Sequence, residues 1–142
     1  MTEFWRKWLV VASAGVAAIG VAFTVIAVTG AEGVLGDILK SVYPGDDPDT
    51  QESGLLLIGI TGAVMAGWTT LAVILFSDPT TASRPATWRG LAGGLTVWFL
   101  LDSTASIATG ATLNLVPNVI FLAVFAPALA ATRPRSAQSR GG

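Results

Sequence analysis

The sequence predicts an all-α integral membrane protein, a four-helix bundle with both termini in the cytoplasm. Hydrophobic residues make up 52% of the 142 residues and charged residues only 12%, whereas soluble domains carry about 25% charged residues. The mean hydropathy is +0.66. The apolar residues also occur in uncharged blocks of about the 20 residues that a spanning helix needs.

Four such blocks divide the chain. The predicted spans cover about residues 9–29, 54–76, 89–109 and 115–131 of a single membrane domain, residues 1–132. Because the first block follows Arg6 and Lys7, a cleaved signal peptide is the alternative there. Signal cores usually have about 7–15 apolar residues, and this block is longer, so we expect an uncleaved anchor.

The connection at residues 30–53 is the only long one, and it is acidic. Apolar residues recur at helical spacing within 35–42, which predicts a short amphipathic helix at the membrane surface. The acidic string DDPD at 46–49 lacks the alternating ligands, central Gly and closing Glu of an EF-hand loop. We therefore expect an exposed loop without bound calcium.

Small residues recur every four positions along the first two spans, and they predict faces on which another helix can pack closely. These residues are Ala14, Ala18 and Ala22 in the first span and Gly59, Ala63 and Gly67 in the second.

The basic residues near the span ends predict the orientation. Seven lie on the side that carries both termini: Arg6, Lys7, Arg84, Arg89, Arg133, Arg135 and Arg140. Only Lys40 lies on the other side. By the positive-inside rule, the termini and the basic tail at 133–142, which we expect to be disordered, are cytoplasmic, and the acidic loop is outside. A composition rich in Ala, Gly and Arg is typical of GC-rich bacterial genomes, so we expect the bacterial inner membrane.

Several kinds of chemistry are excluded by residue type. The chain has no Cys and no His, so we expect no metal site, no cofactor and no histidine base. A net charge of -1 gives no reason to expect binding to nucleic acid. Ser103 and Ser106 have no nearby His or Lys to activate them, so we predict that the protein is not an enzyme.

The candidate site is a polar seam around Asp102, the only ionisable residue deep within a predicted span. Residues spaced four, four and three apart share one face of the third span: Trp98, Asp102, Ser106 and Thr109. A tight turn then returns the chain, which brings Asn114 and Asn118 of the fourth span toward this face. No Lys or Arg lies within any span, so hydrogen bonds, protonation or a partner subunit must compensate the carboxyl group.

Two interpretations of this seam remain open. In the first, Asp102 holds the third and fourth spans together through Asn118, a contact worth about 0.6–2 kcal/mol. In the second, the seam lines a small polar pocket, because acids within membranes commonly mark ligand or proton paths. We slightly favour the first.

The layout of one span, an outer loop with a Tyr43-Pro44-Gly45 turn, and three further spans ending in a tight hairpin resembles the DoxX-like and BphX-like small bacterial membrane proteins. The polar stretch from Trp98 to Gly110 adds to the resemblance. The resemblance implies a four-helix membrane fold. It implies no site residues, because such families largely lack an assigned biochemical role.

We therefore expect an accessory membrane component, or one that binds a small ligand or a lipid, in contact with the lipid bilayer. Assembly as a homo-oligomer and assembly with a partner membrane protein are both compatible with the sequence. The alternative is a proton-coupled small-molecule transporter that acts as an oligomer.

The orientation is testable with single cysteines, because the chain has none of its own. In intact cells, Asp47→Cys should react with a membrane-impermeant maleimide, and Ser139→Cys should react only after permeabilisation. Labelling of both positions from the same side would contradict a chain with four spans.

Overall fold

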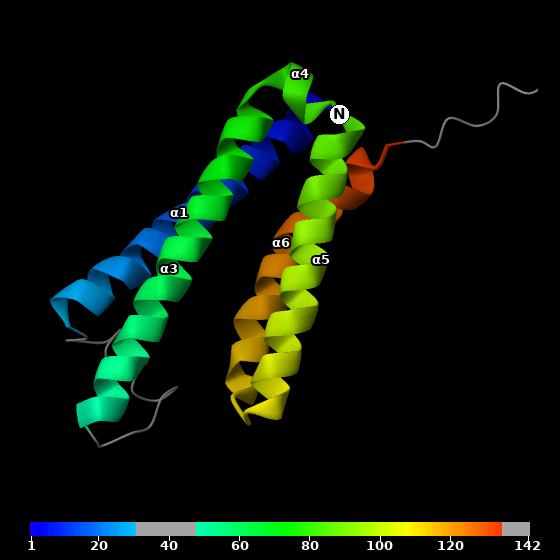
Figure 1. The fold of residues 1–142 in the computed structure, drawn as a ribbon. Coiled ribbons are helices and arrows are strands. Elements are labelled where there is room, and N and C mark those ends of the chain that lie inside the picture. Colours follow the sequence, from blue (N-terminus) through cyan, green and yellow to red (C-terminus); the bar gives the residue numbers. More distant parts are fainter. Residues whose placement is uncertain (31–47, 135–142) are drawn as a thin grey trace, which may run out of the picture. The chain divides into compact units, whose positions relative to one another are not determined.

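The computed structural model describes residues 1–30 and 48–134, and within these ranges the chain is helical, without strands (Figure 1). The elements are α1 (Glu3–Thr29), α3 (Pro48–Ser77), α4 (Pro79–Ala82), α5 (Pro85–Ala108), the 3-10 helix η1 (Thr112–Asn114) and α6 (Leu115–Thr132). Four of them are long and apolar enough to cross a membrane, which confirms the predicted all-helical class and the number of spans.

The helices extend beyond the uncharged blocks from which they were predicted. α1 begins at Glu3 and contains Arg6 and Lys7, and α3 begins at Pro48. Glu3 and Lys7 form an exposed ion pair of 2.8 Å one turn apart, which supports a helix that projects from the apolar span. The amphipathic helix predicted at 35–42 and most of the predicted disordered tail lie outside the described residues.

Most of the apolar surface of these helices is not covered by the protein. Only 17–22% of the most apolar window of each candidate span is buried. Large side chains such as Val11, Leu101 and Leu113 are about two-thirds exposed or more. Contiguous apolar surface of this extent is typical of a surface that contacts lipid, and it supports a multi-pass membrane protein.

Contacts divide the chain into two compact units, and we describe each separately. The unit Ser13–Val73 contains most of α1 and α3. These helices run antiparallel, because Gly20 meets Gly62 whereas Thr24, further along α1, donates to the carbonyl of Gly59 at 3.4 Å. A Cβ atom on Gly20 would lie 2.6 Å from Gly62 O and 2.7 Å from Ala66 N. Glycine is therefore required at this crossing.

The packed face matches the predicted small-residue spacing only at Gly59, where an added Cβ would lie 3.0 Å from Ala27 Cβ. Ala14, Ala18 and Ala22 are exposed, and no neighbouring atom lies within 4 Å of a Cβ placed on Gly67. The buried face of α1 instead carries Ser13, Val16 and Gly20. Spacing alone could not separate these faces, because small residues occur all round α1.

The second unit contains Met1–Ala12 and the residues from Ile74 onward. In it α5 and α6 are antiparallel neighbours joined by a short connection. Gly110 has φ +78°, a left-handed conformation that ends α5 at little cost for glycine. Leu91, Leu95, Phe125 and Ala128 are buried in this unit.

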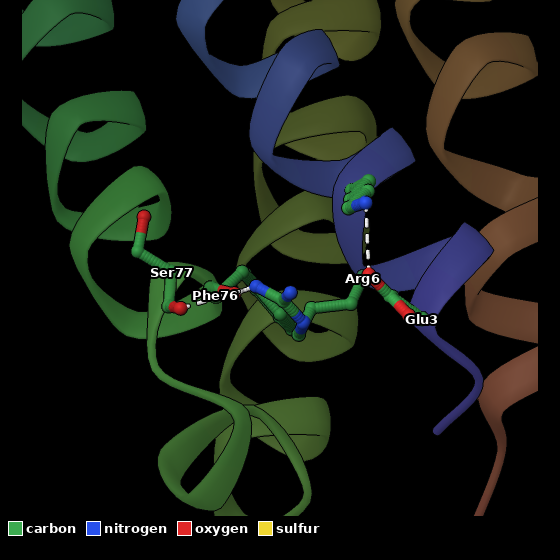
Figure 2. A network of polar contacts seen from close by, with 5 residues as sticks. Glu3, Arg6, Phe76 and Ser77 are labelled. Carbon is green, nitrogen blue, oxygen red and sulfur yellow. Dashed lines mark hydrogen bonds and ion pairs between the residues drawn. The ribbon is translucent and has the colours of Figure 1, made fainter.

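The end of α3 is held by Arg6. Its guanidinium donates to the carbonyls of Phe76 at 3.2 Å and Ser77 at 3.1 Å, which Figure 2 shows. The last carbonyls of a helix lack intrahelical partners and carry partial negative charge, so an arginine is well suited to them. Asp78 then caps α4, and its bonds from the Thr81 hydroxyl and from the N–H groups of Thr81 and Thr80 hold the pKa of this carboxyl below its usual value.

Two tryptophans satisfy carbonyls of α6. Pro127 removes the N–H that would bond to Ala123 and crowds the same turn. The Trp8 indole donates to the next carbonyl, Val124 O, at 2.9 Å. Trp88 donates at 3.0 Å to Leu129 O, one of the last four carbonyls of α6. The Trp88 bond supplies a donor where the helix itself cannot, whereas Trp8 donates to a carbonyl one residue beyond the one that Pro127 leaves without a donor.

The Gly20 contact predicts a specific sensitivity. Gly20→Ala should lower the free energy of unfolding in detergent by about 1–3 kcal/mol, because the added methyl group meets backbone atoms that cannot move aside cheaply. Gly15→Ala is the matched control in the same helix, since its Cβ would meet nothing within 4 Å, and it should be neutral or stabilising. Equal effects of the two substitutions would contradict the close crossing.

Candidate functional site

The antiparallel pair α5 and α6 positions the site. Asp102 lies on α5, about two turns before the helix ends. The connection then returns the chain, so that Asn114 at the end of η1 and Asn118 in α6 lie beside α5. Asn118 is 2% exposed and Ser106 is 4% exposed, whereas Asp102 is half-buried. The polar side chains therefore lie between the two helices rather than on the lipid-facing surface.

The two asparagines bind one oxygen of the carboxyl group. Asp102 Oδ2 accepts a hydrogen bond from Asn118 Nδ2 at 2.5 Å and another from Asn114 Nδ2 at 3.0 Å. Asn118 Nδ2 also donates to Ser103 Oγ at 3.3 Å, and Asn114 Nδ2 donates to Ser106 Oγ at 2.9 Å. We call these five residues the Asp102 cluster.

Ser106 is oriented by its own helix. Its hydroxyl donates to the backbone carbonyl of Asp102 at 2.7 Å, one turn back. A serine hydroxyl has a single proton, so with that proton committed the oxygen presents lone pairs to Asn114. The cluster is thus internally consistent in its donors and acceptors, which a buried polar network requires.

Amide dipoles, rather than a cation, compensate the carboxyl group. Within residues 1–30 and 48–134, no ion pair to Asp102 exists. Each side-chain hydrogen bond between membrane helices is worth about 0.6–1.7 kcal/mol, and Oδ2 receives two amide donors. These two donors compensate the carboxyl group of Asp102, for which the predicted spans contain no basic residue.

The structure brings together four of the six predicted site residues and separates two. Asp102, Ser106, Asn114 and Asn118 form hydrogen bonds with one another. Trp98 instead makes an edge-to-face contact with Phe121, with ring centroids 5.9 Å apart.

Thr109 is the second residue that stands apart. It follows the last residue of α5, and its hydroxyl donates to the carbonyl of Ala105 at 2.9 Å. Its position on the same helical face as Asp102 did not bring it into the cluster, because a threonine hydroxyl readily bonds to its own backbone one turn back.

The arrangement is suited to binding through Asp102 Oδ1. Within the described part of the chain, no donor bonds to this oxygen, whereas Oδ2 receives two. The serines are not bonded to a side-chain base, and no group of three His, Cys, Asp or Glu lies together among the described residues. The geometry thus offers a hydrogen-bond acceptor and no assembled nucleophile.

Sequence reasoning missed a second polar region, at the opposite ends of α5 and α6. Arg84 and Arg133 line a pocket of about 600 Å³ there. The sequence showed only that these arginines flank the spans. The signal that could have found the pocket is the antiparallel pairing itself, which places the residue before α5 at the same end as the residue after α6.

Comparisons of the chain with protein-family models, with curated proteins and with solved structures found no match. The site is therefore interpreted from its own geometry.

The cluster predicts different effects for two substitutions at one position. Asp102→Asn keeps an oxygen that accepts from both asparagines, so its melting in detergent should match the parent's. Asp102→Leu removes the acceptor and leaves two amides without it, which should lower the free energy of unfolding by about 1–3 kcal/mol.

Thr104→Leu is the control, because it makes a similar polar-to-apolar change at an exposed position of α5. It should leave the unfolding free energy nearly unchanged. Severe loss of folded Asp102→Asn protein would contradict compensation by amides, and it would indicate a cationic partner on another subunit.

Proposed function

We propose that this protein is an accessory or small-ligand-binding component of the bacterial inner membrane, with both termini in the cytoplasm, and that it is not an enzyme. The observation that carries the proposal is the unequal use of the Asp102 carboxyl oxygens. Two asparagines hold Oδ2, and Oδ1 of the half-buried side chain receives no donor from the described residues. A ligand that donates a hydrogen bond, such as a hydroxyl or an amine, is complementary to this oxygen.

The surroundings favour an amphipathic ligand. The site lies between two helices whose outer surfaces are apolar, with exposed Leu101 and Val119 nearby along the chain. A molecule with one polar donor and an apolar body can reach such a site from the bilayer and leave its apolar part in lipid. The likeness to DoxX-like and BphX-like proteins, which implies a similar membrane fold, stays a prediction.

The alternative function is proton-coupled transport of a small molecule by an oligomer. It draws support from the same carboxyl group, because acids within spans commonly serve as proton relays. Two amide hydrogen bonds fix the position of the Asp102 carboxyl group, which suits a binding group better than a proton carrier that must move. We therefore place transport second.

The proposal is tested by extracting the parent and Asp102→Asn proteins from their native membrane in mild detergent and identifying the bound small molecules by mass spectrometry. The parent should retain a molecule with a hydrogen-bond donor, and Asp102→Asn should retain much less of it. An Asn in this position still accepts from Asn114 and Asn118, but its own N–H₂ group then takes the place of Oδ1 and opposes a donor.

Thr104→Asn is the control, because it places an amide on an exposed position of the same helix. Equal small-molecule content in all three proteins would contradict a ligand site at Asp102. Transport is separated by sealed vesicles that contain a pH-sensitive dye: a pH gradient dissipated by the parent and not by Asp102→Asn would favour the transporter instead.

A further inference from the structure

A pocket at the arginine-bearing ends of α5 and α6 is independent of the Asp102 cluster. Its volume is about 600 Å³. The chain begins there, α3 ends there, and α5 begins where α6 ends. The lining includes Thr2, Phe76, Arg84, Trp88, Thr132 and Arg133. Each of these lies within a few residues of the end of a candidate span, which is where a spanning chain meets the membrane surface.

The basic residues at this end are not equivalent. Arg6 is committed to the carbonyls of Phe76 and Ser77, and Lys7 is paired with Glu3 at 2.8 Å. Arg84 and Arg133 make no ion pair or side-chain hydrogen bond to the residues that the structure describes, and these are the two that line the pocket. Two guanidinium groups thus face one cavity with their donors unused.

Neighbouring polar groups do not supply a competing partner. The charge of Arg84 contributes to lowering the pKa of Asp78, but the two form no ion pair. The carboxylate oxygens of Asp78 instead accept from the N–H groups of Thr80 and Thr81. The hydroxyls of Ser83 and Thr132 donate to the carbonyls of Pro79 and Ala128. Among the side chains that line the pocket, the charged donors without a described partner are therefore the two arginines, and the hydroxyl of Thr2 is a neutral one.

We propose that this pocket binds the phosphate of an anionic phospholipid headgroup. A guanidinium presents a planar fork of donors that matches phosphate oxygens, and two forks from separate helices can clamp one phosphate. Basic pockets between spanning helices are recognised sites for anionic headgroups. The indole N–H of Trp88 donates to Leu129 O, which holds the ring at the pocket wall. Tryptophans are enriched at the headgroup level of membranes, which fits a lipid ligand.

A lipid is favoured over free phosphate by the position of the pocket. Half-buried Trp88 and buried Phe76 line it together with the arginines, so one ligand would contact both charged and apolar groups. A phospholipid has a phosphate next to an apolar body, whereas inorganic phosphate would leave the apolar lining unused.

The experiment is native mass spectrometry of the full chain in detergent, titrated with phosphatidylglycerol or with phosphatidylcholine. The parent should bind phosphatidylglycerol preferentially. The double variant Arg84→Gln, Arg133→Gln should bind it about tenfold or more weakly, because each basic residue near an anionic lipid is worth about a fewfold in affinity. Its binding of phosphatidylcholine should not change.

The matched control is the double variant Lys7→Gln, Arg89→Gln. It also removes two positive charges near the pocket-side ends of the spans, but neither residue lines the pocket. It should bind phosphatidylglycerol like the parent. A second variant, Arg84→Lys with Arg133→Lys, keeps both charges and should bind with intermediate strength, since lysine lacks the planar fork.

Three results would overturn the proposal. Equal losses in the Gln pair and in its control would show attraction by overall charge only. Equal binding of the two lipids by the parent would show no recognition of the anionic headgroup. Displacement of phosphatidylglycerol by an equal concentration of inorganic phosphate would identify a free-phosphate site.

Discussion

A carboxyl group inside an apolar helix pair must be compensated without water, and this constraint organises the α5 and α6 unit. The chain meets it with two asparagine amides that bind one oxygen of Asp102. For both amides to reach that oxygen, α6 must begin within a few residues of the end of α5. The short connection with Gly110 in a left-handed conformation and the 3-10 turn at Thr112–Asn114 provides this geometry. The Asp102 cluster therefore depends on the geometry of this turn.

The same requirement governs the backbone elsewhere in this unit. Carbonyls that lack an intrahelical donor are costly next to lipid, because no water replaces the lost bond. Arg6 supplies donors to the end of α3, and Trp88 supplies one to the end of α6. Trp8 donates to Val124 O, one residue beyond the carbonyl that Pro127 leaves without a donor. These side chains act as structural donors, which leaves Arg84 and Arg133 as the basic groups that line the surface pocket without a described partner.

The sequence predicted the spans well because composition alone decides them. Uncharged blocks of about 20 residues can hardly be anything else. It also predicted that Asp102, Ser106, Asn114 and Asn118 would meet, since helical spacing and one tight turn suffice. It did not find the crossing at Gly20 and Gly62, because Ala14, Ala18 and Ala22 offered an equally small face. It placed Trp98 and Thr109 in the seam from spacing, although Trp98 packs on Phe121 and the Thr109 hydroxyl bonds to its own helix. Contacts between distant segments, such as Trp8 with Val124, depend on tertiary packing that spacing does not report.

The central claim is that Asp102 and Asn118 stabilise each other directly. A double-mutant cycle with Asp102→Ala, Asn118→Ala and the pair, measured as unfolding free energies in detergent, tests this claim most directly. The account predicts a coupling of about 0.6–1.7 kcal/mol, the range found for hydrogen-bonded side chains between membrane helices. Effects that add to within about 0.3–0.5 kcal/mol, as for independent sites, would contradict it.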